Sequence, residues 1–271
     1  MRIHAIEVGR VRVHKEHFEG SKNRLWVFYS QSWATTIPIH AFLIEHSNGL
    51  VLFDTGENPR CHDPSYVPWW TPNTVEYDVK PEDAIDRRIV ELGFKIEDIK
   101  YVILSHLHTD HIGGVHLFPH ATFFVTRREW RDAHRFGASF FGGYHKEHFD
   151  YPNFKYNLID FTPIKGAGVF ETGFDLFEDQ SMILVPTPGH TRGHQSLLVY
   201  KDRPICLAGD AVLSQHHLNG SIVDGIASHP ALSLQTIKKL KTWSGMHHFA
   251  PVVAVHDPMA NVLLSKGNDD R

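Results

Sequence analysis

The segment His106-Leu107-His108-Thr109-Asp110-His111 brings together four side chains of the types that bind metal ions. Histidine is the commonest metal ligand in proteins, and this chain of 271 residues contains 22 of them. Even at that abundance, chance would produce the pattern HxHxDH only about 0.01 times in such a chain. A histidine-rich surface turn is therefore the weaker interpretation, and the spacing predicts a metal site.

The elements around this motif are typical of a site built at the end of a strand. The apolar run Tyr101–Leu104 predicts a strand, and residues two apart in its extension, His106 and His108, point the same way. Asp110 and His111 lie beyond, where a turn would direct them to a second point nearby. Four ligands are too few for two metal ions, so we expect further ligands elsewhere.

Three more polar residues end apolar runs in the second half of the chain. His190 follows the run 182–185, Asp210 follows 204–207, and His256 ends the run 251–255. A polar side chain at the end of a buried strand is tolerated when it has a partner. One such residue is ordinary, but three of them together with HxHxDH predict the missing ligands.

This combination resembles the metallo-β-lactamase superfamily, from Asp54-Thr55-Gly56 through His256. Within the superfamily, SHLHTDHIGG and TPGHTRGHQSLLV resemble most the N-acyl-homoserine lactonases, which are quorum-quenching enzymes. The resemblance implies two metal sites, the first held by His106, His108 and His190, the second by Asp110, His111 and His256, with Asp210 bridging both. It also implies that Asp54 supports a ligand imidazole from behind. His194, four residues after His190, is either a structural hydrogen-bonding group or a functional one.

The resemblance implies a metal-dependent hydrolase that opens the lactone ring by attack of a metal-bridging hydroxide. Asp110 or Asp210 would then take the proton of the nucleophile. Five imidazoles and two carboxylates suit two divalent ions, Zn²⁺ first, with Fe²⁺, Co²⁺ or Mn²⁺ as alternatives. The enzymatic alternatives are another lactone or ester hydrolase and a phosphotriesterase or phosphodiesterase. A flavodiiron-like redox protein would favour a glutamate among the ligands, where this chain has His108.

One position departs from the lactonase pattern. Lactonases of this type commonly have a tyrosine three residues after the bridging aspartate, and it binds the substrate carbonyl; this chain has Leu213 there. Either another donor replaces the phenol or the substrate differs. Four residues are candidates for that donor by position alone: Tyr144, Tyr151, His216 and His217.

Groups of strands, each followed by helices, predict the fold. We expect an α/β (α+β) chain with two mainly antiparallel mixed sheets packed together and helices outside, as one αββα domain over residues 1–271. Strands are predicted at 2–14, 37–46, 50–53, 101–104, 121–125, 168–177, 182–186, 196–201, 204–208 and 251–255, and helices near 81–92, 114–118, 127–136 and 231–243.

Two aromatic segments, 57–80 and 136–161, show neither helical nor strand periodicity and predict loop or lid insertions. They either pack as a core under long loops or form an apolar wall for an acyl chain. The pocket residues expected under the second interpretation are Trp69, Trp70, Phe140, Phe141 and Tyr144, together with Leu213 and His216. A further aromatic group favours a homodimer, as in related lactonases: Phe18, Trp26, Phe28, Tyr29 and Trp33.

Composition limits the other partners. A net charge of −4 with mixed signs argues against a nucleic-acid partner, and no apolar run approaches the length of a membrane helix. The first residues lack the apolar core of a signal peptide, and Cys61 and Cys206 are too few for a disulfide framework. The chain is therefore expected to be cytoplasmic, with a small lactone as its partner.

Overall fold

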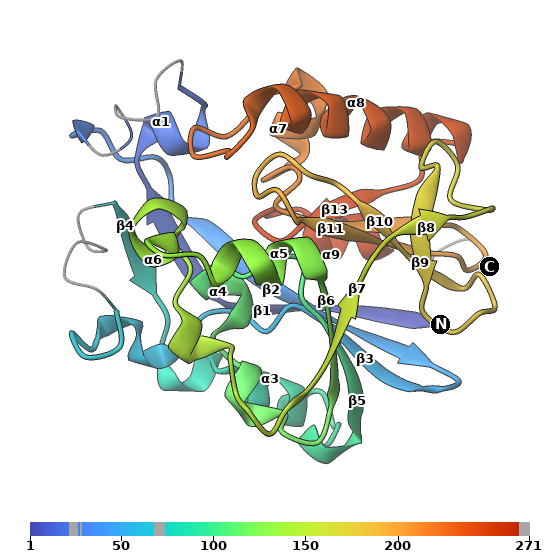
Figure 1. The fold of residues 1–271 in the computed structure, drawn as a ribbon, viewed down its shortest axis with the longest axis horizontal. Helices are drawn as coiled ribbons and strands as arrows, with labels where there is room; N and C mark the ends of the chain where they lie inside the picture. Colours follow the sequence, from blue (N-terminus) through green and yellow to red (C-terminus); the bar gives the residue numbers. More distant parts are fainter. Residues whose placement is uncertain (22–26, 28, 68–73, 266–271) are drawn as a thin grey trace.

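The computed structural model describes residues 1–21, 27, 29–67 and 74–265. Its strands form two sheets that pack face to face, and helices cover their outer sides (Figure 1). This arrangement confirms the predicted α/β class and the αββα order of layers.

The first sheet has seven strands in the order β4-β1-β2-β3-β5-β6-β7. Their bounds are β1 Arg2–Val13, β2 Ile37–His46, β3 Gly49–Phe53, β4 Val75–Asp78, β5 Ile99–Ile103, β6 Thr122–Thr126 and β7 Lys155–Ile159. The pairs from β4 to β3 are antiparallel, whereas those from β3 to β7 are parallel. The sheet is therefore mixed, as predicted, and its parallel half arises because helical crossovers return the chain in the same direction.

The second sheet has six strands in the order β13-β12-β11-β10-β9-β8. Their bounds are β8 Thr162–Pro163, β9 Thr172–Asp175, β10 Met182–Pro186, β11 Gln195–Val199, β12 Ile205–Gly209 and β13 Val252–Ala254. All pairs are antiparallel except β12 with β13, so this sheet is mainly antiparallel as predicted.

The α-helices are α1 Lys15–Phe18, α3 Ile85–Glu91, α4 Thr109–Ile112, α5 Arg127–Ala133, α6 Ala138–Gly142, α7 Gln215–Gly220, α8 Pro230–Met246 and α9 Ala260–Ser265. Short 3₁₀ turns lie at Pro59–His62, Pro81–Asp83, Ile96–Asp98, Val115–Leu117 and Lys146–His148. In the described part of the chain, the helices lack the length and apolar character needed to cross a membrane.

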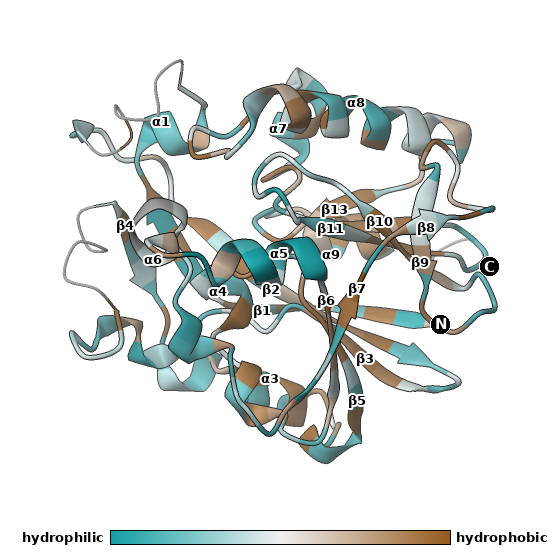
Figure 2. Ribbon diagram, in the orientation of Figure 1, coloured by the Kyte–Doolittle hydropathy of each residue, from teal (hydrophilic) through white to brown (hydrophobic). Residues whose placement is uncertain are grey.

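Two apolar layers hold these elements together. Phe42, Phe53, Leu184 and Leu197 belong to the layer between the sheets, and the strands there are largely hydrophobic (Figure 2). A second layer forms where Trp243 of α8 packs on the second sheet. Burial of each large apolar side chain stabilises the folded state by roughly 1.5–3 kcal/mol. The strands are therefore held rigidly, and so are the polar residues at their ends.

The two aromatic segments contain strands that the sequence does not predict. β4 lies within 57–80 and pairs with β1, and β7 lies within 136–161 and pairs with β6. Both are edge strands in which half-buried and exposed residues mostly alternate, so each shows only a weak apolar pattern. Trp69 and Trp70 lie outside the described residues, as do the side chains of Phe140 and Phe141.

Candidate metal centre

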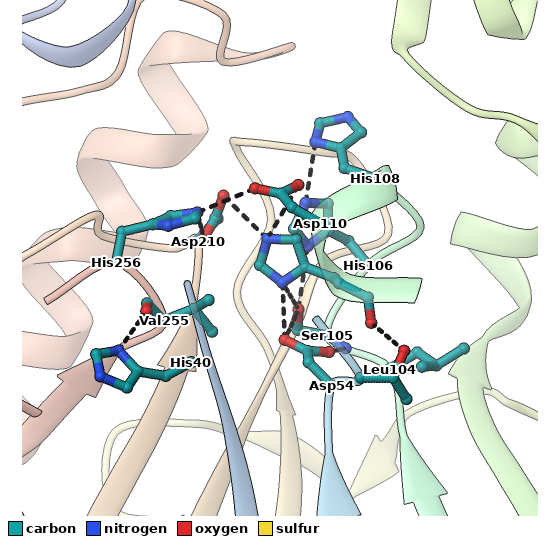
Figure 3. Close-up of polar contacts among 12 residues, drawn as sticks. His40, Asp54, Leu104, Ser105, His106, His108, Asp110, Asp210, Val255 and His256 are labelled. Carbon is teal, nitrogen blue, oxygen red and sulfur yellow. Dashed lines mark hydrogen bonds and ion pairs between the residues drawn. The ribbon is translucent and has the colours of Figure 1, made fainter. Parts of the chain in front are cut away.

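The structure brings all seven predicted ligands to one edge of the two sheets. His106 and His108 follow β5, and the short helix α4 carries Asp110 and His111. The other three follow strands of the second sheet: His190 after β10, Asp210 after β12 and His256 after β13. Figure 3 shows the part of this cluster around Asp210. Because the strands end at the same edge, residues up to 150 positions apart meet there.

The first candidate metal group consists of three imidazoles. Nδ1 of His108 lies 3.0 Å from Nε2 of His106 and 3.0 Å from Nε2 of His190. Burial, reinforced by the neighbouring histidines, lowers the pKa of His106 and of His108 well below the usual range. Both rings are therefore neutral at neutral pH and carry the lone pair that a metal ligand needs.

The second candidate group consists of Asp110, His111 and His256. Nε2 of His111 lies 3.7 Å from Oδ1 of Asp110, and Nε2 of His256 lies 3.4 Å from Oδ2 of the same carboxylate. Burial opposes a charge on His111, but the carboxylates of Asp210, Asp110 and Asp54 outweigh it and raise its pKa well above the usual range. The raised pKa of His111 therefore reflects its close pairing with the carboxylates of Asp110 and Asp210.

Asp210 lies between the two groups. Its Oδ2 is 3.5 Å from Nε2 of His190 and 3.4 Å from Nε2 of His111, while its Oδ1 is 3.4 Å from Nε2 of His256. Oδ1 of Asp210 and Nε2 of His111 are buried without a hydrogen-bond partner. Such atoms are costly unless a cation satisfies them, so the donor set fits two divalent metal ions that share one carboxylate.

Each ligand imidazole has a neighbour at its other ring nitrogen, and that contact aims the ring at the site. His108 donates from Nε2 to the Gly142 carbonyl at 2.9 Å, and His256 donates from Nδ1 to the Pro38 carbonyl at 2.9 Å. The remaining contacts are His106 Nδ1 with Ser105 Oγ at 3.0 Å, His111 Nδ1 with Asp54 Oδ2 at 2.8 Å, and His190 Nδ1 with Asp224 Oδ2 at 3.2 Å.

The structure places Asp54 directly behind His111. Asp54 is fully buried and also accepts hydrogen bonds from the backbone N–H and the hydroxyl of Ser105 (Figure 3). Burial raises its pKa, although the donors from His111 and Ser105 oppose that rise. Its φ of 59° is a strained conformation for a non-glycine residue, which these three contacts maintain.

His194 contacts the backbone of Asp210. The Asp210 N–H donates to Nε2 of His194 at 3.0 Å, so Nδ1 carries the proton and donates to Thr187 Oγ1 at 2.8 Å. Burial, together with the nearby His190, lowers the pKa of His194 to about 3. A Cβ on Gly209 would lie 2.7 Å from this ring nitrogen, which explains the glycine before Asp210.

Sequence reasoning missed several residues behind the ligands. Asp224 follows the apolar pair Ile222-Val223, which is too short to predict a strand, so the rule that found the other strand-end residues does not select it. Glu129 is buried on α5 and accepts from the Leu107 N–H and from Thr191 Oγ1, which fixes the loops that carry the ligands. Ser105 could have been recognised, because it precedes HxHxDH directly and its side chain can bond the neighbouring ring.

A cavity of about 540 Å³ opens above the ligands. Val11, Val13, Ile37 and Val75 form an apolar wall on the side of the first sheet. The exposed Phe136 lies at the rim, and the buried Tyr144 and Leu213 also line the cavity. The cavity therefore combines a polar floor with an apolar wall.

The structure places only some of the predicted pocket residues in the cavity. Tyr144 and Leu213 line the cavity, but His216 is exposed on α7 and does not line it, because that face of the helix points to solvent. Of the other proposed donors, Tyr151 packs on the core, and His217 contacts the backbone carbonyl of Phe18. The expectation that His216 lines the substrate pocket is therefore wrong.

The family model for the metallo-beta-lactamase superfamily matches residues 34–243, so the chain belongs to that superfamily. It is 34% identical over 236 residues to N-acyl homoserine lactonase AttM from Rhizobium radiobacter, with 83% of each chain covered. It is also 31% identical over 212 residues to an N-acyl homoserine lactonase from a Bacillus species, with 76% of each covered.

Solved structures show the same fold. A structure of N-acyl homoserine lactone hydrolase with its product N-hexanoyl-L-homoserine at the catalytic metal centre superposes with a TM-score of 0.77 at 22% identity, covering 100% of this chain and 96% of the other. AidC, described as a dizinc quorum-quenching lactonase, gives a TM-score of 0.65 at 16% identity, covering 94% and 87%. These likenesses confirm the metallo-β-lactamase fold.

Proposed function

We propose that this protein hydrolyses the ring ester of N-acyl homoserine lactones, using two divalent metal ions. The observation that supports this most is the pair of ligand groups sharing Asp210 on the floor of a cavity with an apolar wall. The lactonase relatives at 34% identity over 83% of their length agree with it.

When bound, two divalent ions polarise an ester carbonyl and lower the pKa of water, which supplies the electrophile and the nucleophile. His106, His108 and His190 would hold the first ion, and Asp110, His111 and His256 the second, with Asp210 between them. Neutral imidazoles and anionic carboxylates bind zinc well, and His111, whose pKa is raised by the surrounding carboxylates, would release its proton when the ion binds.

The carboxylates of Asp110 and Asp210 differ in their exposure to solvent. The side chain of Asp110 is 15% exposed, against 6% for Asp210. Asp110 is therefore placed to take the proton of the attacking water at its carboxylate, while Asp210 holds the two ligand groups together. Asp54 and Asp224, behind His111 and His190, keep those rings in position throughout the reaction.

The apolar wall suits the acyl chain. An acyl chain lying along Val11, Val13, Ile37 and Val75 would gain up to about 0.8 kcal/mol for each buried methylene group. The lactone ring, which carries the scissile ester, would then lie over the ligands. The wall thus orients the substrate and excludes water from one side of it.

The proposal extends to the metal, the assembly and the location. We propose zinc as the metal. We also propose a homodimer, because Tyr29 of the N-terminal aromatic group is 72% exposed and could pack against a second copy of the chain. Trp26 and Phe28 of that group lie outside the described residues. A single domain is supported by the core that joins both sheets, and a cytoplasmic location by the free, buried Cys61 and Cys206.

A metal analysis and a substrate panel test this function. We expect about two metal ions per chain and, in a pH-indicator assay, rapid hydrolysis of N-acyl homoserine lactones with slower hydrolysis of a simple β-lactam and a phosphotriester. Faster hydrolysis of the phosphotriester would instead favour the phosphoesterase alternative. Light scattering of the purified protein measures the assembly.

A further inference from the structure

His17, on the short helix α1, lines the same cavity as His190, Asp210 and Leu213. It comes from the N-terminal part of the chain, far from every predicted ligand in sequence. The charged groups that act most strongly on its ring are Asp224 and His190, followed by Asp210. His17 therefore lies on the side of the cavity where Asp224 supports His190.

The backbone around His17 is held tightly against the segment that follows Asp210. The Gly225 N–H donates to the His17 carbonyl at 2.8 Å, and a Cβ on Gly225 would lie only 1.9 Å from the Glu16 carbonyl oxygen. On the next residue, the Phe18 carbonyl accepts from Nε2 of His217 at 2.6 Å. These contacts fix the backbone on both sides of His17, whose side chain lines the cavity.

Ester hydrolysis places negative charge on the carbonyl oxygen, and a donor aimed at that oxygen accelerates the reaction. Leu213 cannot donate. Two hydroxyls that share the cavity already donate elsewhere, that of Thr191 to Glu129 at 2.7 Å and that of Ser228 to the Gly189 carbonyl at 3.1 Å. The hydroxyls of Tyr77 and Thr109 bond to each other at 3.0 Å. Tyr144 is buried with its hydroxyl directed to Glu129 and Thr191.

We propose that His17 donates a hydrogen bond to the carbonyl oxygen of the scissile lactone ester, next to the His106, His108 and His190 group; this rests on the proposed lactonase function. Burial, more than the nearby charges, lowers the pKa of His17 to about 4. The ring is then neutral near pH 7, and a neutral imidazole still carries one N–H donor.

His17→Ala tests this assignment with a homoserine lactone as substrate. We expect kcat to fall by roughly 10²–10³, the usual effect of removing one such donor, with a much smaller change in KM. Metal content and the midpoint of thermal unfolding should equal those of the wild type. His216→Ala, which removes an exposed histidine of α7 outside the cavity, is the matched control and should leave kcat unchanged.

Two rescue variants distinguish a donor from a packing residue. His17→Gln keeps an N–H group and should recover part of kcat, and His17→Ala combined with Leu213→Tyr should recover more, because the phenol supplies a donor from the other side. Failure of both variants to recover kcat would overturn the assignment.

The remaining outcomes separate this inference from the proposed function. A His17→Ala variant that keeps kcat within about threefold of the wild type, or that loses metal together with activity, overturns the role of His17 while the lactonase function stands. A wild-type protein that binds two metal ions but hydrolyses no lactone overturns the proposed function, and the assignment of His17 with it.

Discussion

The floor and the rim of the cavity are built in different ways. On the floor, ligands such as His106, His111 and His190 are almost fully buried and follow strands of the two central sheets. On the rim, Phe136 is fully exposed, and α6 is flanked by Gly137 and Gly143 in the left-handed conformation. Every ligand ring has a second contact behind it, whereas Phe136 projects from the surface.

Because the floor is buried and hydrogen-bonded and the rim is exposed, we expect the floor to position the metal ligands and the rim to select substrates. A rigid, hydrogen-bonded floor keeps its ligands within a fraction of an ångström of the geometry that catalysis needs. An exposed rim side chain such as Phe136 can be replaced without disturbing the ligands, and is therefore suited to selecting substrates. His108 joins the two regions, because its Nε2 donates to the Gly142 carbonyl of α6.

The largest effect is expected from Asp210→Asn on the floor. The amide loses the charge that holds both ligand groups together, so the protein should bind less of both metals and kcat should fall by about 10³ or more. Metal analysis and steady-state kinetics measure the two effects. Two retained metals with near-normal turnover would contradict the bridging role of Asp210.

Asp224→Asn should have the next largest effect, since it weakens the support of His190 without removing a ligand. We expect metal affinity to fall by roughly 10–100-fold, the usual cost of losing a partner behind a ligand. Competition with a chelator measures that affinity, and Asp202→Asn, at an exposed position, is the control. Equal affinities in the two variants would show that Asp224 does not orient the ring.

A pH effect on stability is expected from His148, which is buried in the 3₁₀ turn Lys146–His148. Burial, with the nearby His145, lowers its pKa from 6.5 to about 4, and its Nε2 donates to the Tyr66 carbonyl at 3.0 Å. The unfolded state therefore binds more protons between these pH values, so this contribution is present above pH 6.5 and is lost as the pH falls toward 4.

Urea unfolding at pH 7 and at pH 4.5 measures this contribution. The wild type should lose about 1–2 kcal/mol more of its unfolding free energy on acidification than His148→Gln, which keeps a donor but does not titrate. Equal losses in the two proteins would mean that His148 is not protonated on unfolding. Metal loss at low pH affects both proteins alike.

The smallest effect is expected from Phe136→Ala on the rim. Its full exposure makes the stability cost small, within about 0.5 kcal/mol. The value of kcat/KM should fall a few-fold for long-chain homoserine lactones and hardly at all for short ones, with unchanged metal content. Phe249→Ala, at an exposed position that does not line the cavity, is the control. Equal losses for all chain lengths would contradict an acyl-binding rim.

The amino-acid sequence was sufficient to predict the fold class and to select all seven residues that meet at the centre. HxHxDH places four of them within six positions, and His190, Asp210 and His256 each end an apolar run. Both signals are local, because strand periodicity and ligand spacing extend over only a few residues. The same local rule fails for β4 and β7, since edge strands bury too little surface to show a clear pattern.

Only the tertiary structure decided what surrounds those ligands. Asp224 contacts His190, the Gly142 carbonyl accepts from His108, and His17 and Leu213 line one cavity, while His216 faces solvent. The spacing of residues along the sequence predicts none of these contacts, because each depends on how segments far apart in the chain pack on the two sheets. A motif fixes which side chains can bind a metal, but the packing of distant loops fixes their orientation and the shape of the cavity above them.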